Sequence, residues 1–299
     1  MLTNERDFAA DFVVEQLTTL GALVQRINVE SVHSRSATTW SPDAELNDET
    51  PTAVWWRQFE VESRPGTLWE ADEQLVDKAQ WRAWLATLHQ PGTAWMNDLW
   101  AARRAENKVE QLRVGKRVGF TIPRTIVTTD ATEAAAFRSA VGKAVVKTLS
   151  AGYFALSDQA FVFTEQLDDA ILFDDDAWRS APLVVQELLD GALDARVVSL
   201  GRECFGAQCN SKGVDWRKTP FDPELWSRWD VPITLARACE DYRNALGLEF
   251  AAFDFMIHRD AVYFLEANQA GEWMFLDRTL DLGVGMAIAN RLVALGRPT

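Results

Sequence analysis

The strongest constraint on this chain is a pair of apolar segments near its carboxyl end that acidic residues interrupt. The stretch 248–273, LEFAAFDFMIHRDAVYFLEANQAGEW, predicts two strands joined by a short polar turn at 258–261. A three-residue or bulged turn would bring Asp254 opposite Glu266. Two carboxylates and an amide are therefore expected to converge within this hairpin. Alternation along the second strand predicts four side chains on one face: Val262, Phe264, Glu266 and Asn268.

Converging oxygen ligands of this kind are typical of a site for a hard divalent cation. An unpaired carboxylate buried among phenylalanines costs on the order of several kcal/mol. Two carboxylates a few ångströms apart also repel each other, so such a site requires a cation. Oxygen-only ligands favour magnesium or manganese over zinc, and magnesium held by carboxylates commonly also binds substrate phosphates. The alternative is a hairpin at the margin of a sheet, whose acids face water.

The length and charge of the chain exclude several classes of protein. With 299 residues it can bury a large core, and we expect one compact protein of two or three subdomains. The formal net charge of −14, without dense clusters of Lys and Arg, argues against a nucleic-acid partner. No apolar run approaches the roughly 20 residues of a membrane span, so no membrane partner is expected. Three cysteines without CxxC spacing indicate reduced thiols in a cytoplasmic protein: Cys204, Cys209 and Cys239.

Segments with helical periodicity alternate with short apolar strands, which indicates an α/β (α+β) fold. No Gly-x-Gly-x-x-Gly follows a strand, so a dinucleotide-binding fold has no support. The predicted helices cover residues 7–20, 69–88, 95–112, 132–139, 231–246 and 284–295. Besides the acidic hairpin, the predicted strands include residues 53–59, 121–127, 143–149 and 183–188.

Cations interrupt or end three of the apolar strands. Arg57 lies near the end of AVWWRQF, directly after two tryptophans, where it could lie against the rings or bind a carboxylate. A surface arginine at a strand end is the alternative. Lys147 interrupts AVVKTL, as a phosphate-binding lysine would and as a lysine on an edge strand also could. Asp194 and Arg196 lie two residues apart on a predicted strand and therefore share a face.

Taken together, these pieces resemble the ATP-grasp superfamily, and specifically its microviridin-type or graspetide peptide ligases. The resemblance extends from about residue 2 to about residue 295. Six segments carry it in the family's order: WWRQF, WMNDLWAARRAENKVEQLRVGKRVGFTIPRTIVTTD, AVVKTL, VVQELLDGALDARVV, GVDWR and FLEANQAGEW. It implies an N-terminal pre-ATP-grasp α/β domain (1–95), a central lid subdomain with an ATP-covering loop (96–185), and a C-terminal ATP-grasp subdomain with the magnesium site (186–299).

The resemblance also implies which residues bind ATP and Mg²⁺ (or Mn²⁺). The metal would be held by Asp254, Glu266 and Asn268. Arg196 and Arg217 would be catalytic, facing the transferred phosphate and the acyl-phosphate. Lysines would contact the phosphates, the backbone around 187–189 would bind adenine, and either of two aspartates would bind the ribose. These expected nucleotide contacts are Lys108, Lys147, Gln186, Glu187, Leu188, Leu189, Asp190 and Asp194.

The activity that the resemblance implies is carboxylate activation. An Asp or Glu side chain of a ribosomal precursor peptide, consisting of a leader and a core, would become an acyl-phosphate. A Lys, Ser or Thr of the same peptide would then close a macrolactam or macrolactone. Arg57 is assigned to this substrate, and a homodimer is expected. Gln269 departs from the family, since many relatives have proline there.

Two alternatives to this activity stay open. One is another ATP-grasp ligase, which joins free amino acids or adds glutamate to a protein tail. The other is a non-catalytic ATP-binding module.

Overall fold

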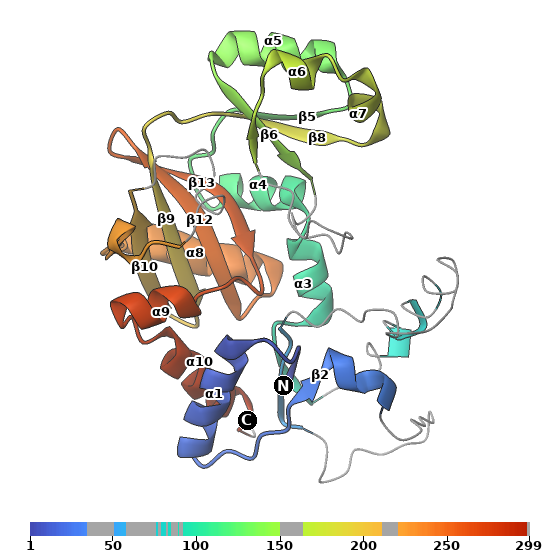
Figure 1. Cartoon of the computed structure of the whole chain (residues 1–299). Coiled ribbons are helices and arrows are strands. Elements are labelled where there is room, and N and C mark those ends of the chain that lie inside the picture. The colour runs from blue at the N-terminus through green and yellow to red at the C-terminus, as the bar shows by residue number, and fades with distance from the viewer. Residues whose placement is uncertain are drawn as a thin grey trace.

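The computed structural model describes most of the chain. The described residues are 1–34, 51–57, 92–149, 164–210 and 221–297, together with 76, 79–81, 83, 84 and 89. Arg217, the expected ATP-covering loop after residue 149 and most of the expected helix 69–88 lie outside them. The described part is built around two antiparallel sheets, a larger one in the middle of the molecule and a smaller one above it (Figure 1).

The larger sheet has five strands in the order β11-β10-β9-β12-β13. Its strands are β9 (Leu193–Leu200), β10 (Glu203–Cys209), β11 (Trp226–Arg228), β12 (Phe250–His258) and β13 (Ala261–Asn268). Helices α4 (Lys108–Arg117) and α8 (Ile233–Leu246) pack on one face of this sheet. Aromatic rings fill the space between them, with the Phe120 and Phe264 centroids 4.9 Å apart. This packing fixes α4 against β13, the strand at the edge of the sheet.

The smaller sheet has four strands in the order β5-β8-β6-β7. They are β5 (Thr125–Thr128), β6 (Ala144–Thr148), β7 (Glu165–Gln166) and β8 (Leu183–Glu187). Helices α5 (Ala131–Val141), α6 (Asp169–Leu172) and α7 (Asp175–Ser180) cover one face and bury Trp178. Asp130 caps α5, because its side chain accepts the Thr132 N–H. The other face is turned toward α4 and the larger sheet (Figure 1).

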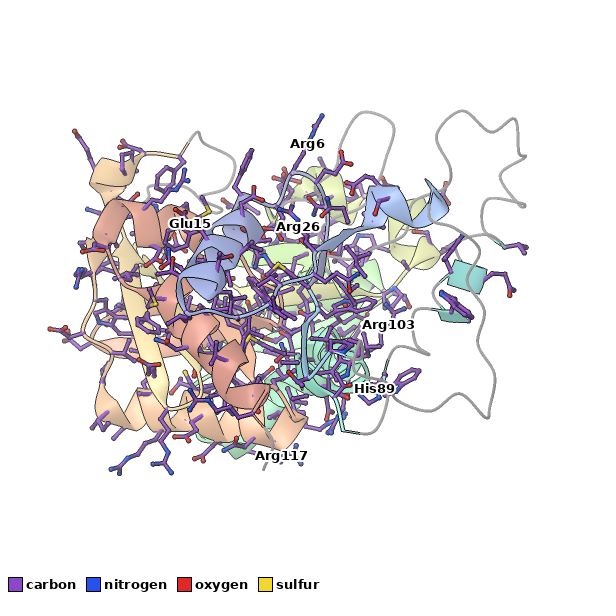
Figure 2. All side chains as sticks on the ribbon, turned by 90° about the horizontal axis from the view of Figure 1, so that it is seen from below. Arg6, Glu15, Arg26, His89, Arg103 and Arg117 are labelled. Carbon is purple, nitrogen blue, oxygen red and sulfur yellow. The ribbon has the colours of Figure 1, made fainter. Side chains whose placement is uncertain are left out.

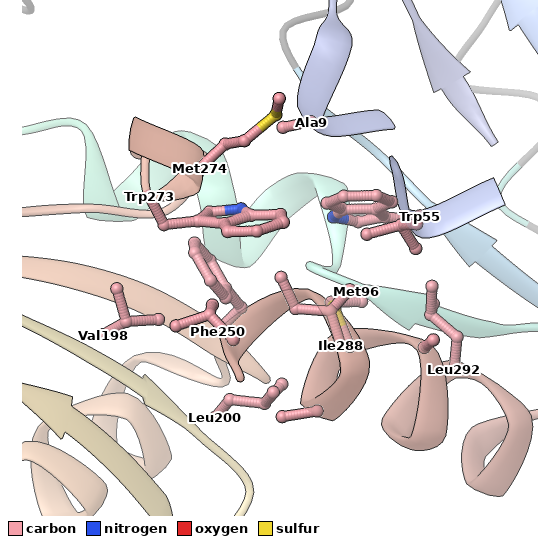
Figure 3. Packing of buried hydrophobic residues seen from close by; sticks show 14 of the residues in the cluster. Ala9, Trp55, Met96, Val198, Leu200, Phe250, Trp273, Met274, Ile288 and Leu292 are labelled. Atoms are coloured by element: carbon pink, nitrogen blue, oxygen red, sulfur yellow. The ribbon is translucent and has the colours of Figure 1, made fainter. Parts of the chain in front are cut away.

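The two ends of the chain meet below the larger sheet. Helix α1 (Phe8–Thr19) packs against α10 (Val284–Leu295). Around them lie β1 (Leu2–Thr3), β2 (Ile27–Asn28), η1 (Val29–Ser34), β3 (Ala53–Trp55), β4 (Ala94–Met96) and α9 (Met274–Leu280). Figure 3 shows the shared core, in which Trp55 and Trp273 lie near Phe250, Met96 and Ile288. Surface side chains such as Arg6 and Arg117 lie at opposite edges of the molecule in Figure 2.

The single helix predicted over 95–112 is wrong. Trp95 and Met96 belong to β4, and the helical part is divided into α3 (Leu99–Ala105) and α4. Two capping residues cause the division. Asp98 accepts the N–H groups of the first turn of α3, and Asn107 accepts the Glu110 N–H at the start of α4. No helix among the described residues is long and apolar enough to cross a membrane.

The division at residues 95 and 185 stays a prediction, although the structure supplies landmarks for it. Residue 95 lies within β4, which pairs with β3 in parallel. The chain passes from the smaller sheet to the larger one between β8 and β9, at residues 188–192. Helix α4, within the expected central subdomain, packs on the larger sheet.

One buried amide ties α3 to both strands of the acidic hairpin. Asn97, 2% exposed, precedes α3 and donates to the carbonyls of Phe250 and Gln269, each at 2.8 Å. Its oxygen accepts the N–H groups of Glu249 at 2.7 Å and Phe250 at 2.9 Å. Asn97 therefore satisfies four backbone groups at the start of β12 and after β13.

We expect Asn97→Ala to lower the free energy of unfolding by about 3 kcal/mol or more. Four hydrogen bonds of roughly 1 kcal/mol each are lost, and buried backbone groups are left unpaired. Asn290→Ala, at an exposed position on α10, is the control and should change stability by less than about 0.5 kcal/mol. Urea denaturation measures both. Equal stabilities of the two variants would contradict this role for Asn97.

Candidate active site

The acidic hairpin forms as the sequence predicts, with Asp254 directly opposite Glu266. The turn contains two residues, Arg259 and Asp260, both with positive φ (49° and 64°). The irregularity lies within the ladder rather than in the turn, because the register shifts between Asp254 and Phe255. The additional residue is Leu265 of β13, which a β-bulge accommodates. The expected pairing of the two carboxylates is confirmed.

The predicted face of β13 is wrong, and the bulge is the reason. Val262 and Phe264 pack with Ala267 against α4 and α8. Since the bulge shifts the alternation by one residue, Glu266 and Asn268 point to the opposite face. On that face they lie with Asp254. Thus the side chains expected to bind the metal are separated from the phenylalanine core, whereas simple alternation had predicted that they lie beside it.

The acidic side chains form a compact, charge-balanced cluster with two cations. Arg196 of β9 pairs with Asp254, with Nε 3.2 Å from Oδ1 and Nη2 3.4 Å from Oδ2. Asn268 donates through Nδ2 to Asp254 Oδ2 at 3.3 Å. Lys108 Nζ lies 3.5 Å from Glu266 Oε2. The exposed fractions of the charged side chains are 23% for Asp254, 18% for Glu266, 9% for Arg196 and 10% for Lys108. Two acids and two cations thus lie in one half-buried group.

Lys108 reaches Glu266 because α4 is bound to the edge of β13. Gln111, 4% exposed, donates through Nε2 to the carbonyls of Ala105 at 2.6 Å and Ala267 at 2.9 Å. Its Oε1 accepts the Ala267 N–H at 3.1 Å. The side chain therefore pairs with Ala267 as a neighbouring strand would, at a position where no other described strand does. Lys108 precedes Gln111 by three residues and so projects from the same side of α4.

The donors of this cluster fit a hard divalent cation. Two carboxylates and an amide oxygen are the ligands that magnesium takes, whereas zinc prefers Cys and His. Among the described residues no group of three His, Cys, Asp or Glu side chains could hold a metal, so the third protein ligand would be Asn268. The Arg196 Nε is buried and has no hydrogen-bond partner among the described residues, despite its 3.2 Å approach to Asp254. This N–H suits an additional anionic oxygen at the site.

A second polar group lies on the smaller sheet. Lys147 Nζ donates to Gln186 Oε1 at 3.0 Å, and Gln186 Nε2 donates to Thr125 Oγ1 at 2.9 Å. The register of β5, β8 and β6 places these three side chains on one face. Val146 and Val185, on the opposite face, pack under α5–α7. Lys147 therefore lies on the face turned toward the larger sheet.

The expected nucleotide contacts 187–190 lie at the end of β8 and in the connection to β9. Glu187 and Leu188 use their N–H groups within the protein, at 2.9 Å from the Arg124 carbonyl and 3.0 Å from the Lys143 carbonyl. The Leu188 and Leu189 carbonyls also accept hydrogen bonds within the protein, from the N–H groups of Asp190 at 3.1 Å and Ala192 at 3.2 Å. Asp190 is exposed, and its hydrogen bond with Lys143 holds the pKa of this carboxyl below its usual range.

Asp194, the other candidate for the ribose, lies on β9. It pairs with Met256 of β12, as Arg196 pairs with Asp254, and therefore shares a face with Arg196 as the sequence predicts. Asp194 is the second residue of β9, so it lies directly after the connection from the smaller sheet.

The assignment of Arg57 to substrate needs correction, because this residue is only 1% exposed. Its Nε donates to Asp7 Oδ2 at 2.8 Å, and its guanidinium also pairs with Glu272. Nη1 lies 3.5 Å from the Gly271 carbonyl. Asp7, in turn, caps α1 by accepting the Ala10 N–H. Arg57 binds carboxylates as the sequence suggests, but they belong to the protein and join α1 to the segment after β13.

Sequence reasoning missed the three amides that position the site. Asn97 and Gln111 bind backbone groups of the hairpin, and Gln269 donates to Glu106 Oε1 at 3.0 Å. The one available signal was the placement of Gln111 on the same helical side as Lys108, where a buried polar residue requires a partner. The partners themselves are about 150 residues away and leave no local pattern.

If Arg57 is structural, Arg57→Ala should destabilise the fold by about 3–5 kcal/mol, because Asp7 loses its buried partner. Arg291→Ala is a suitable control. Arg291 pairs with Glu249 at 2.6 Å, but the side chains are 36% and 30% exposed, so we expect a loss of about 1 kcal/mol or less. Chemical denaturation checks both values. An unchanged stability of Arg57→Ala, together with a raised KM for peptide, would restore the substrate assignment.

Comparison with known proteins identifies the fold. No protein-family model matches the chain, and no curated protein matches it. A RiPP-associated ATP-grasp ligase from Chryseobacterium gregarium, in complex with ADP and a leader and core peptide, is 22% identical, with a TM-score of 0.83 over 99% of this chain and 96% of that chain. The macrocyclase MdnB from Microcystis aeruginosa MRC is 25% identical, with a TM-score of 0.78 over 98% of each chain. The ATP-grasp ligase PsnB, complexed with a phosphomimetic variant of its minimal precursor, Mg and ADP, is 17% identical, with a TM-score of 0.75 over 99% of this chain and 98% of that chain. The chain therefore has the ATP-grasp fold, in the form found in ligases of ribosomal peptides.

Proposed function

We propose that the protein is an ATP-dependent, ADP-forming ligase that crosslinks the side chains of a ribosomal precursor peptide. An Asp or Glu carboxylate of the peptide is phosphorylated, and a Lys, Ser or Thr of the same peptide then displaces the phosphate. Activation is necessary because oxide does not leave from a carboxylate, whereas phosphate leaves from an acyl-phosphate. The product is a macrolactam or a macrolactone.

The observation that carries this proposal is the cluster of Asp254, Glu266 and Asn268 beside Arg196 and Lys108, within an ATP-grasp fold. Phosphoryl transfer requires positioned cations and a metal more than a nucleophilic side chain. The cluster supplies oxygen ligands for magnesium and guanidinium and ammonium groups for phosphate oxygens. The ADP and Mg in the structures of similar ligases support ATP and Mg²⁺ as the cofactors here.

The roles of the residues follow from their positions. Asp254, Glu266 and Asn268 would hold the metal, which neutralises charge on the phosphates when it is bound. The buried Arg196 donates to an oxygen of the transferred phosphoryl group through the N–H that has no partner among the described residues. Lys108 and Lys147 bind phosphate oxygens from α4 and from β6. The low exposure of Arg196 and Lys108 excludes water from these contacts and strengthens them.

The finer parts of the proposal concern partners and location. The peptides in the structures of similar ligases support a precursor of leader and core as the substrate. A homodimer, a cytoplasmic location, the absence of a nucleic-acid partner and a catalytic role for Arg217 complete the proposal. A ligase of amino acids or of a protein tail is the second candidate, because its carboxylate activation requires the same cluster.

The metal role of Glu266 predicts that Glu266→Gln keeps the fold but lowers ligation by roughly 100-fold or more. Glutamine is nearly isosteric and lacks the charge that holds the metal. Glu203→Gln, at an exposed position on β10, is the matched control and should retain the wild-type rate. ADP release in the presence of precursor, ATP and magnesium measures both. Equal rates for the two variants would remove Glu266 from the site.

The mass of the product distinguishes the two candidate functions. Each bond made through an acyl-phosphate eliminates one water, so the precursor should lose roughly 18 Da per bond and release one ADP for each loss. Mass spectrometry together with an ADP assay gives both quantities. A mass gain equal to an added amino acid would support the second candidate instead. ATP binding without any ADP release would indicate a non-catalytic ATP-binding module.

A further inference from the structure

A shallow basic hollow of about 750 Å³ lies on the outer side of α3 and α4, where the two helices meet. Residues from both helices line it. They include Trp100, Arg103, Arg104, Val109, Glu110 and Arg113; Figure 2 labels Arg103. We refer to this surface as the arginine hollow. It lies on the side of α4 away from Gln111 and Lys108, which are turned toward β13.

Two of these arginines are held in place by one shared carboxylate. Arg104 Nε lies 3.2 Å from Glu110 Oε1, and Arg113 Nη1 lies 3.0 Å from Glu110 Oε2. The Glu110 side chain is 17% exposed, whereas those of Arg104 and Arg113 are 52% and 64% exposed. The carboxylate thus lies beneath two open guanidinium groups. It neutralises one of their two charges and fixes their spacing, while most of their N–H groups remain accessible to a ligand.

An exposed aromatic ring and a third guanidinium complete the arginine hollow. Trp100 is 66% exposed, although a ring of this size normally buries most of its surface. The Arg103 side chain is 65% exposed and pairs with Glu106 at 3.3 Å. Arginine and tryptophan are the residue types most enriched where proteins bind partners. Carboxylates would be bound by the guanidinium forks, and the apolar stems of a peptide would lie against the ring.

We propose that the arginine hollow binds a carboxylate-rich segment of the peptide substrate. This inference rests on the proposed function, in which Asp and Glu side chains are the groups to be activated. The chain has a formal net charge of −14, so it repels an acidic peptide in general and attracts it only where cations gather. A segment bound here lies across α4 from Lys108 and Glu266. The remainder of the peptide would therefore begin on the same helix as Lys108, which in the proposed function binds the ATP phosphates.

The test uses fluorescein-labelled hexaglutamate as the probe and fluorescence anisotropy as the measurement. The test variant is Arg104→Gln/Arg113→Gln, since glutamine preserves helix propensity and can still donate to Glu110. The control is Arg202→Gln/Arg237→Gln, which changes two exposed arginines away from the arginine hollow. Each double variant removes two positive charges, from −14 to −16, so non-specific charge effects are matched.

We expect the test variant to bind the probe roughly tenfold more weakly than the wild type, and the control to bind within about twofold. Equal losses in the two double variants, or a wild type that does not bind hexaglutamate, would overturn the proposal. Sedimentation gives a second check. If the test variant alone changes from dimer to monomer, the arginine hollow is an interface between copies and not a peptide site.

Two further measurements separate this proposal from the proposed function. Both double variants should bind Mg·ATP as the wild type does, because Lys108, Arg196 and the metal ligands are unchanged. With a true precursor, the test variant should show a raised KM and a kcat close to that of the wild type. A wild type that binds the probe through the arginine hollow but ligates no peptide would overturn the proposed function and leave this binding site in place.

Discussion

The site depends on the three hydrogen bonds made by the Gln111 side chain. β13 is an edge strand among the described residues, so the N–H and carbonyl of Ala267 need a partner other than a neighbouring strand of that part of the chain. The Gln111 amide supplies both partners, at 3.1 and 2.9 Å, and so fixes the first turn of α4 beside Glu266 and Asn268. The 3.5 Å distance between Lys108 and Glu266 follows from this contact. A helix packed only through apolar side chains would not determine that distance so closely.

Charge balance explains how these polar groups persist within an apolar sheet. Asp254 and Glu266 face each other across neighbouring strands, where two uncompensated carboxylates would repel. Arg196 and Lys108 offset that repulsion, and Asn268 Nδ2 and Arg196 Nη2 both donate to Asp254 Oδ2. Under the proposed function, Arg196 and Lys108 would bind phosphate oxygens, and Asp254 and Glu266 would hold the metal. The groups that balance charge within the cluster are thus the ones to which the proposed function assigns metal and phosphate binding.

Periodicity in the sequence predicted the elements, but not the contacts between distant elements. The α10 helix has the predicted bounds 284–295, and Asp254 pairs with Glu266 as predicted. The bulge at Leu265 escaped prediction, since no residue type marks it, and it placed Glu266 and Asn268 on the face opposite Val262 and Phe264. Arg57 was misassigned because its burial depends on Asp7, 50 residues earlier in the chain. Helix 95–112 was wrong because the apolar periodicity concealed the caps at Asp98 and Asn107.

The chain connects the smaller sheet to the rest of the protein at two points. One connection lies between α4 and β5, and the other lies between β8 and β9. The first crossing is held to the larger sheet at Thr121, whose carbonyl accepts the Phe264 N–H at 2.8 Å. Two such crossings define a line. A rigid-body rotation of the smaller sheet that keeps both connections in place would have the line between them as its axis. Any such rotation would change the distance between Lys147, on the smaller sheet, and the acids Asp254 and Glu266, on the larger one.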